Sequence, residues 1–199
     1  MSALNAPANN PLDTLILVDH EDREAGFMSK EECHRGQGIL HRAFSVFLFN
    51  PQGEVLLQQR SAEKPLWPLY WSNSCCSHPR RGESVEGAAR RRLREELALG
   101  CELAFLYKFE YRAHFRDIGT EHELCWVFAG FGGGPPNANA AEIAAWRYVP
   151  AATLSAELAA TPDRFTPWLR LEWTEIARRH LPQILARIAN PAAPALGPR

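Results

Sequence analysis

A cysteine, a histidine and several charged residues lie close together in the stretch WSNSCCSHPRRGES, which runs from Trp71 to Ser84. Its two adjacent thiols are Cys75 and Cys76, and His78 follows two positions after the second. A thiol can carry a proton, and an imidazole can bind a metal. Adjacent residues of an extended segment face opposite sides, so only one of the two thiols can face a given pocket. The default for cysteines in a reducing compartment is a buried, inert thiol, and one of this pair is a candidate exception.

A second set of residues has the side-chain types of a metal site. Its members are His34, His41, His78, Glu121 and Glu123. Glu121 and Glu123 are two positions apart at the start of a predicted strand, so both side chains leave the same face. Three imidazoles with two carboxylates suit zinc or manganese. A histidine near the end of an element is also often solvated or a helix cap, and we expect this of the other four. These are His20, His114, His122 and His180.

Residues 84–97 predict a helix whose apolar face contains a charged pair. The apolar members of this face are Val85, Ala88, Ala89, Leu93 and Leu97. Arg92 and Glu96 fall within the same face, one turn apart. The simpler interpretation is an ion pair at the border of the helix, which would stabilise it by roughly 0.3 kcal/mol. The alternative is a carboxylate that holds a hard cation, and the helical wheel leaves both open.

The whole chain has the size and composition of one globular domain. It has 199 residues, of which 46% are hydrophobic and 23% charged, so a sizeable core is expected. A net charge of −1 gives no general attraction to nucleic acid or membranes. No apolar run approaches the roughly 20 residues of a membrane span, and the first residues do not resemble a signal peptide. We expect a cytoplasmic protein whose five cysteines form no disulfide framework.

The predicted elements alternate between strands and helices, and several of the strands are linked as hairpins. The predicted strands span residues 12–20, 42–50, 54–60, 70–74, 103–112, 122–131 and 144–150. The predicted helices span residues 29–34, 84–97, 150–159 and 168–188, and Pro182 is expected to kink the last. This order predicts an α/β sandwich with a mixed sheet. Residues 1–11 and 190–199 have a composition typical of disorder, which leaves 12–189 as a single domain.

The predicted helix resembles the Nudix box, a pattern that binds magnesium against a diphosphate. When GESVEGAARRRLREEL is anchored on Glu83, four later positions agree, namely Arg91, Leu93, Glu95 and Glu96. Three positions depart: Ser77 and Ala98 replace glycines, and Arg92 replaces a glutamate. Arg92 removes one metal ligand and adds a positive charge, which argues against ordinary Nudix hydrolysis of a diphosphate.

The segment WSNSCCSHP resembles the signature of type 1 isopentenyl-diphosphate delta-isomerases, a family within the Nudix fold. The similarity extends from about residue 13 to residue 180. The resemblance implies a Nudix-like α/β/α sandwich with a mixed β-sheet. It also implies the interconversion of isopentenyl diphosphate and dimethylallyl diphosphate in isoprenoid biosynthesis. The reactive thiol of the family falls at Cys76, which leaves Cys75 as a structural residue.

The resemblance also implies roles for individual residues. Cys76, Glu123 and Tyr111 would be catalytic, and the sequence leaves open whether the thiol or Glu123 delivers the proton. The histidine and glutamate set would hold Mn²⁺ or Zn²⁺. Mg²⁺ bound to the diphosphate would be held by Glu96 and the carbonyl of Cys76.

The substrate implied by the resemblance is a small prenyl diphosphate. Its diphosphate would be bound by the three basic residues Arg60, Lys64 and Arg92. Trp168 would offer its π-face to the developing positive charge, an interaction worth about 2 kcal/mol when desolvated. The family suggests a monomer, and no nucleic acid or membrane partner is expected.

Two other functions remain open from the sequence. One is a Nudix diphosphohydrolase, against which Arg92 and the WSNSCCSHP segment argue. The other is a binding module in which the histidine and glutamate set holds a structural metal. The module predicts that removal of metal unfolds the chain and that no prenyl diphosphate binds.

Overall fold

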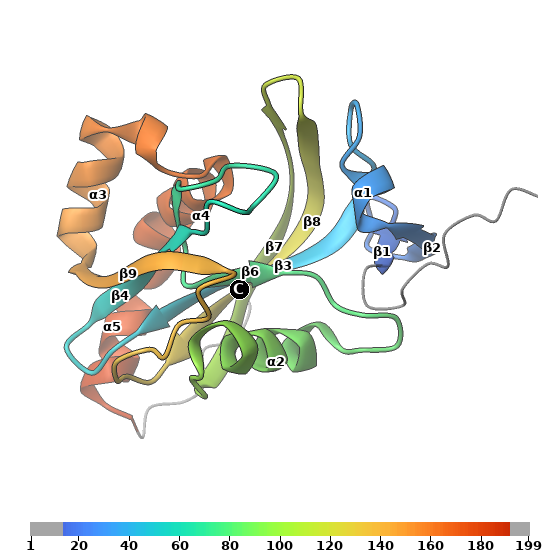
Figure 1. Ribbon diagram of the computed structural model, residues 1–199. Helices are drawn as coiled ribbons and strands as arrows, with labels where there is room; N and C mark the ends of the chain where they lie inside the picture. Colours follow the sequence, from blue (N-terminus) through green and yellow to red (C-terminus); the bar gives the residue numbers. More distant parts are fainter. Residues whose placement is uncertain (1–13, 192–199) are drawn as a thin grey trace, which may run out of the picture.

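The computed structural model describes residues 14–191, which form a mixed sheet with helices on both faces (Figure 1). This is the predicted class of fold. Residues 1–11 and 192–199, where disorder was predicted, lie outside the described range. Within that range, no helix combines the length and apolar character needed to cross a membrane.

One nine-stranded sheet organises the chain around strand β3. Its strands are β1 (Thr14–Val18), β2 (Glu24–Ser29), β3 (His41–Phe49), β4 (Glu54–Arg60), β5 (Trp71–Ser72), β6 (Cys75–Ser77), β7 (Glu102–Phe115), β8 (Gly119–Phe131) and β9 (Ile143–Pro150). Strand β3 pairs in parallel with β8 and antiparallel with β1, β4 and β6. Strands β7 and β8 form a long antiparallel hairpin, so the sheet is mixed as predicted (Figure 1).

The helices divide between the two faces of the sheet. They are α1 (Lys30–Cys33), α2 (Val85–Leu97), α3 (Ala151–Ala160), α4 (Pro167–Glu175) and α5 (Leu181–Ala189). Helix α2 packs its buried Ala88, Ala89, Leu93 and Leu97 against one face (Figure 1). Helices α3, α4 and α5 cover the other, with Leu154, Leu169 and Ile184 buried against strands β3, β4 and β8.

Helix α2 begins and ends with identifiable caps. The Ser84 hydroxyl accepts a hydrogen bond from the Gly87 N–H at 3.1 Å, as expected of an N-cap. At the other end Ala98 adopts a left-handed conformation with φ of +53°. This is the position where the Nudix pattern has glycine, which adopts that conformation without the steric penalty paid by alanine. The chain therefore keeps the backbone of the Nudix box despite the substitution.

Strand register places the predicted catalytic residues on one face. Ser45 on β3 lies opposite Cys76 on β6, and Tyr111 on β7 lies opposite Glu123 on β8. Glu123 also lies opposite His41 of β3. Since side chains alternate along a strand, Cys76, Tyr111 and Glu123 all share the face of Ser45. Cys75 points to the other face, against α2, as the alternation predicted.

The structure differs from the predicted elements in two places near the site. Strand β2 was not predicted, and the strand predicted at residues 70–74 is divided into β5 and β6. Ser74 lies at the division, where its hydroxyl accepts from the Leu48 N–H and donates to the Leu56 carbonyl, both at 2.7 Å. The side chain thereby satisfies backbone groups of β3 and β4 that no strand pairs with at this point.

The predicted C-terminal helix contains a π-helical turn, Ile176–His180, between α4 and α5. Pro182 follows this turn and has no N–H to donate to the preceding turn of helix. The wider π turn accommodates the missing bond without ending the helix. The predicted irregularity at Pro182 is therefore confirmed.

Candidate active site

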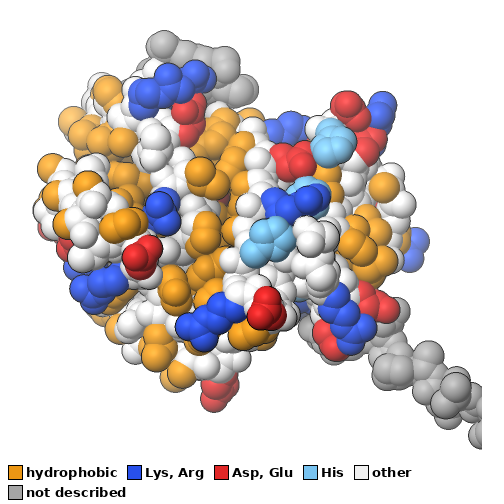
Figure 2. Space-filling model, turned by 90° about the horizontal axis from the view of Figure 1, so that it is seen from above, with side chains coloured by type: hydrophobic (Ala, Val, Ile, Leu, Met, Phe, Trp, Pro, Cys, Tyr) orange, Lys and Arg blue, Asp and Glu red, His pale blue; other side chains and the backbone are white. Residues whose placement is uncertain are grey.

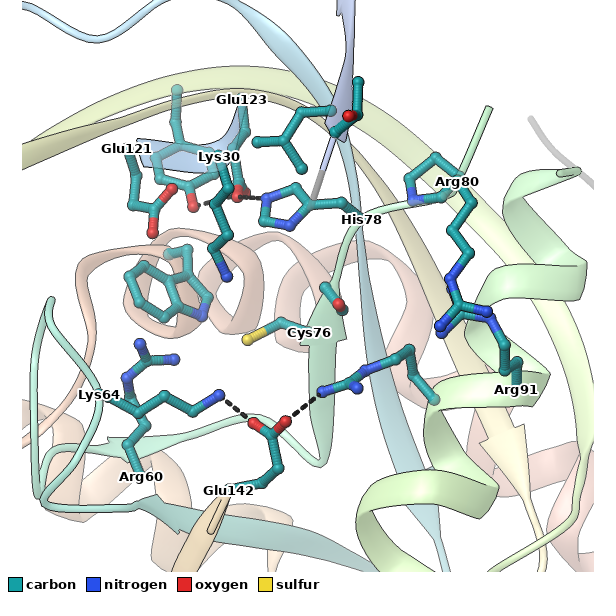
Figure 3. Close-up of a pocket in the computed structure, with 17 residues that line it drawn as sticks. Lys30, Arg60, Lys64, Cys76, His78, Arg80, Arg91, Glu121, Glu123 and Glu142 are labelled. Atoms are coloured by element: carbon teal, nitrogen blue, oxygen red, sulfur yellow. Dashed lines mark hydrogen bonds and ion pairs between the residues drawn. The ribbon is translucent and has the colours of Figure 1, made fainter. Parts of the chain in front are cut away.

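The predicted catalytic and substrate-binding residues line one pocket above the centre of the sheet (Figure 3). Cys76, Tyr111 and Glu123 enter it from β6, β7 and β8. The basic residues and the tryptophan come from three different segments of the chain, and they are Arg60, Lys64, Arg92 and Trp168. Three distant segments of sequence therefore meet, as the resemblance implied. On the molecular face shown in Figure 2, the visible histidine side chains lie on the right half, whereas basic and acidic side chains occur on both halves.

One side of the pocket, here called the histidine end, contains His34, His41, His78, Glu121 and Glu123. Potential ligand atoms of His34, His41, His78 and Glu121 lie within 4.8 Å of one another. Glu123 adjoins them, with its Oε1 3.1 Å from His78 Nε2 and 3.8 Å from His41 Nε2. The structure thus brings together the whole predicted set.

The imidazole of His41 is oriented toward the other members of the histidine end. Its Nδ1 lies 2.7 Å from the carbonyl oxygen of Ile39, so Nδ1–H donates and Nε2 is free to bind a metal. The Nε2 atoms of His41 and His78 lie 3.2 Å apart. Burial lowers the pKa of both the His41 and the His78 imidazole. The pKa of His41 falls to about 4, because repulsion from His78 lowers it further. Both rings are therefore neutral at pH 7, which is the form that ligates metals.

Two buried atoms of the histidine end have no hydrogen bond in the described structure. They are His34 Nε2 and Glu121 Oε2, which lie 2.9 Å apart without the alignment that a hydrogen bond requires. Burial opposes ionisation of Glu121, but the three nearby imidazoles outweigh it and lower the pKa of the carboxyl. An imidazole nitrogen beside an ionised carboxylate fits a divalent metal, which would satisfy both orphaned atoms.

The opposite side of the pocket, here called the arginine end, contains Lys64, Arg92, Glu96 and Glu142. Arg92 Nη2 lies 2.6 Å from Glu96 Oε1 and 2.9 Å from Glu142 Oε1. Lys64 forms an ion pair with the other oxygen of Glu142. The charged face predicted on helix α2 is confirmed, because Glu96 is only 3% exposed.

Burial affects the carboxylates of the arginine end differently. Burial raises the pKa of Glu96 and outweighs the charge of Arg92. Burial also acts on Glu142, but the two cations Lys64 and Arg92 prevail and lower its pKa to about 2. Glu142 is thus the firmly ionised group that holds the two cations together.

Cys76 lies between the two ends, as Figure 3 shows. Burial raises the pKa of its thiol to about 12, and the nearby Arg60 only partly opposes this. Desolvation is therefore a larger effect on this thiol than the charge of the neighbouring cation. The thiol is protonated at neutral pH, which suits a group that stores a proton.

Glu123 is the second proton-transfer candidate, and Tyr111 contacts it directly. The Tyr111 hydroxyl donates to Glu123 Oε2 at 2.7 Å. Burial, reinforced by the charge of Glu121, raises the pKa of Glu123. Burial likewise raises the pKa of Tyr111, which keeps its hydroxyl protonated. A carboxyl whose pKa is raised toward neutrality, with a fixed hydrogen-bond donor, can both accept and release a proton.

Trp168 is held by the residues that begin the signature stretch. Its Nε1–H donates to Ser72 Oγ at 3.0 Å and to Asn73 Oδ1 at 3.1 Å. The Arg60 guanidinium lies 5.2 Å from the centre of the indole ring and donates to the backbone carbonyls of Leu66 and Trp67. Buried hydrogen bonds therefore fix the indole, leaving its apolar surface among the aromatic residues of the pocket.

Comparisons with known proteins agree with this geometry. The NUDIX domain family matches residues 39–169. Isopentenyl-diphosphate Delta-isomerase 1 of Photorhabdus laumondii is 40% identical over 175 residues, which cover 87% of this chain and 99% of that protein. The Isopentenyl-diphosphate Delta-isomerase of Nocardia farcinica is 48% identical over 162 residues, or 81% of this chain and 92% of its own length. The chain belongs to the isopentenyl-diphosphate delta-isomerase family.

Solved structures place the family fold among the Nudix proteins. DR0079 from Deinococcus radiodurans superimposes with a TM-score of 0.61 at 25% identity, over 74% of this chain and 90% of that one. The MutT protein of Methanosarcina mazei superimposes with a TM-score of 0.59 at 15% identity, over 70% of this chain and 94% of that one. The second likeness concerns the fold alone.

The isomerase family member departs from the Nudix pattern in a way that the structure explains. Arg91 keeps its place in the pattern and forms a bidentate pair with Glu83, both distances being 2.8 Å. Through this pair Arg91 supports the loop that carries Glu83, and it also borders the pocket. Arg92 instead neutralises Glu96, which in the Nudix box would adjoin a further carboxylate. One arginine therefore supports the loop, and the other changes the charge of the site.

Three charged residues of the pocket were missed by sequence reasoning: Lys30, Arg80 and Glu142. Lys30 precedes His34 by one helical turn, a spacing that could have placed both on one side of α1. Arg80 belongs to the signature stretch but was given no role. Glu142 had no sequence signal, because its approach to Arg92 depends on how the loop before β9 returns to the sheet.

Proposed function

We propose that the protein interconverts isopentenyl diphosphate and dimethylallyl diphosphate. The observation that carries this proposal is the arrangement of the pocket. A buried thiol and a carboxyl with raised pKa flank a space that has cations on one side and aromatic surface on another. Named relatives over most of the chain support the same activity.

The chemistry requires two proton transfers on one alkene. A proton adds to the terminal alkene carbon, positive charge develops at the tertiary carbon, and a proton leaves the neighbouring carbon on the diphosphate side. Cys76 and Glu123 are the two groups that exchange these protons, one donating and one accepting. Tyr111, through its 2.7 Å hydrogen bond, holds Glu123 in position and can pass a proton to or from it.

The developing positive charge needs stabilisation without water. Trp168 is 3% exposed, and its ring supplies a π-face in an apolar part of the pocket. A nearby cation and an indole face attract one another by about 2 kcal/mol when both are desolvated. Exclusion of water also prevents its capture by the carbocation. We therefore assign Trp168 to the alkene end of the substrate.

The diphosphate is assigned to the basic side chains of the pocket. Arg60, Lys64 and Arg92 offer positive charge that can form charge-assisted hydrogen bonds with phosphate oxygens. Lys30 adds a fourth cation, which the sequence had not indicated. All these residues belong to one chain, so a monomer contains every part of the proposed site.

Two metal ions complete the proposal. The histidine end would hold Mn²⁺ or Zn²⁺, which supplies positive charge that tunes the acidity of the groups around Glu123. Mg²⁺ would be held by Glu96 and the carbonyl of Cys76, and would neutralise charge on the diphosphate. The protein's own contribution is to keep His41 and His78 neutral and to orient His41 through Ile39.

The ion pair of Arg92 with Glu96 argues against hydrolysis of the diphosphate. A Nudix hydrolase concentrates carboxylates here to hold metal ions, whereas this helix gives one of its carboxylates an arginine partner. The site therefore favours binding a diphosphate over cleaving it.

Incubation with isopentenyl diphosphate in heavy water tests the proposal. We expect dimethylallyl diphosphate carrying deuterium, detected by NMR, because the added proton originates from exchangeable groups. Release of phosphate without isomerisation would instead support the hydrolase. If metal-loaded protein neither binds nor changes the substrate, and metal removal unfolds it, a structural metal module is supported.

A further inference from the structure

Two neighbouring arginines of the signature stretch, Arg80 and Arg81, have different surroundings. Arg80 is half-buried and borders the pocket, whereas Arg81 is exposed and stacks its guanidinium 4.5 Å from the centre of the Phe27 ring. In the described part of the chain, the Arg80 guanidinium has no hydrogen bond or ion pair. A half-buried guanidinium without a partner loses part of its hydration, and no hydrogen bond replaces it unless a ligand supplies oxygen atoms.

The loop fixes the direction of Arg80 through its backbone. The Glu83 N–H donates to the Arg80 carbonyl at 2.9 Å, which closes a tight turn, and Gly82 has a φ of +75° within it. The Arg80 N–H in turn donates to Glu83 Oε2 at 2.9 Å, and Glu83 is held by the bidentate pair with Arg91. These contacts use the main chain of Arg80 and leave its side chain free.

Some of the other cations of the pocket are already paired with carboxylates, and some are not. Lys64 and Arg92 share Glu142, and Arg91 is paired with Glu83. Among the described residues, only three cations bordering the pocket lack a carboxylate partner. They are Lys30, Arg60 and Arg80.

The position of Arg80 selects the part of the substrate that it can reach. Arg80 and Arg91 lie on one side of Cys76, and Arg60 and Lys64 lie on the other (Figure 3). The alkene must reach the buried thiol, so the terminal phosphate is the part of the substrate farthest from the thiol. A planar guanidinium can bind two oxygens of such a phosphate at once.

We propose that Arg80 binds the terminal phosphate of the substrate. This inference rests on the proposed function, since it assigns one residue to one part of the proposed substrate. It gives Arg80 a binding role and no part in proton transfer.

The test compares Arg80→Gln with Arg81→Gln in the metal-loaded full-length protein. Calorimetric titration with inorganic pyrophosphate and Mg²⁺ should show about 10-fold weaker binding for Arg80→Gln, since a hydrogen bond to a charged group is lost. Arg81→Gln should bind within about twofold of the unaltered protein, because its side chain contacts Phe27 outside the pocket. Arg80→Lys should recover part of the loss through its charge.

Kinetics with isopentenyl diphosphate provide a second readout. Arg80→Gln should raise KM about 10-fold and leave kcat within about twofold, the pattern of lost binding with intact chemistry. Equal behaviour of the Arg80 and Arg81 variants would overturn the inference, as would a loss confined to kcat. Absence of isomerase activity in the unaltered protein would refute the proposed function, while the pyrophosphate titration would still decide the role of Arg80.

Discussion

The two ends of the pocket use similar residue types in opposite ways. At the histidine end, His34 Nε2 and Glu121 Oε2 are buried without hydrogen bonds. At the arginine end, Arg92 contacts both Glu96 and Glu142, and Lys64 completes the pairing. The first arrangement lacks a positive charge, whereas the second already contains its own. The histidine end is thus suited to bind a cation. The arginine end is suited to bind an anion, which would contact cations that are already paired with carboxylates.

This difference predicts different consequences for substitutions at the two ends. Replacing the ionised ligand Glu121 of the histidine end by a neutral one weakens metal binding and removes a buried charge. Removing Arg92 from the arginine end leaves Glu96 buried and unpaired, which costs stability as well as binding. Metal affinity and the free energy of unfolding therefore separate the two ends experimentally.

The largest effect is expected at Cys76, which lies between the two ends. Cys76→Ala should lower kcat by about 1,000-fold or more, because one of the two proton-transfer groups is lost. Metal and pyrophosphate binding should be retained, since neither end is altered. Cys75→Ala is the matched control, and it should keep most of the activity because Cys75 faces helix α2. If the Cys75 variant is inactive and the Cys76 variant active, the assignment of the reactive thiol is wrong.

A substitution at Glu121 sharpens the description of the histidine end. Glu121→Gln should reduce transition-metal affinity by about 100-fold, because an ionised ligand becomes a neutral amide. A metal titration followed by calorimetry measures the change.

Glu110→Gln on the other face of the same hairpin is the control for Glu121. Glu110 pairs with His20 and His122 away from the pocket. Equal metal affinity in the two variants would contradict the assignment of the histidine end as a metal site.

Helix α2 provides the corresponding test of the arginine end. Arg92→Gln should lower the free energy of unfolding by about 2 kcal/mol, less than for a fully buried pair because Arg92 is partly exposed. It should also weaken pyrophosphate binding while leaving transition-metal affinity unchanged. Chemical denaturation and calorimetry measure these two quantities.

Arg94→Gln, on the exposed side of the same helix, is the control for Arg92 and should be nearly neutral. Should Arg92→Gln weaken transition-metal binding as strongly as Glu121→Gln does, the two ends do not act separately.

The helical pair of the arginine end was predictable from sequence, and the histidine end was not. The 3.6-residue period of helix α2 placed Arg92 and Glu96 on the buried face, and the structure confirms this. For the histidines, spacing in sequence gave little guidance, because their ligand atoms meet only through the pairing of β3 with β6 and β8. There the prediction depended on resemblance to the isomerase family.

Some features required the three-dimensional structure for a clear physical reason. Glu142 reaches Arg92 across 50 residues of sequence, and no local pattern encodes such a contact. The raised pKa of the Cys76 thiol also required the structure, since the extent of its burial is not visible in sequence. Long-range contacts and desolvation are the quantities that local sequence patterns do not supply.

A third buried carboxyl, Glu172 on helix α4, has neither the metal site of one end nor the cations of the other. It is fully buried, its Oε1 accepts from the Cys125 thiol at 3.5 Å, and its Oε2 has no hydrogen bond in the described structure. Burial raises its pKa to about 8, and hydrogen bonding from Ser45 and Cys125 opposes this only partly. The folded protein therefore binds a proton here at pH values where the unfolded chain has released it.

The sign of the resulting pH dependence follows from this difference. A folded-state pKa raised above the unfolded value contributes stability at low pH, and this contribution disappears as the pH rises toward 8. Glu172→Gln removes this titration and keeps the shape of the side chain, while the other titrating groups are common to both proteins. Between pH 6 and 7 the unaltered protein should lose about 1.4 kcal/mol of unfolding free energy relative to the variant. Urea denaturation at each pH measures this difference. If the difference in unfolding free energy between the two proteins stays constant with pH, Glu172 is ionised in the folded protein. An ionised carboxylate could then lie beneath the pocket without the counter-charge that both ends require.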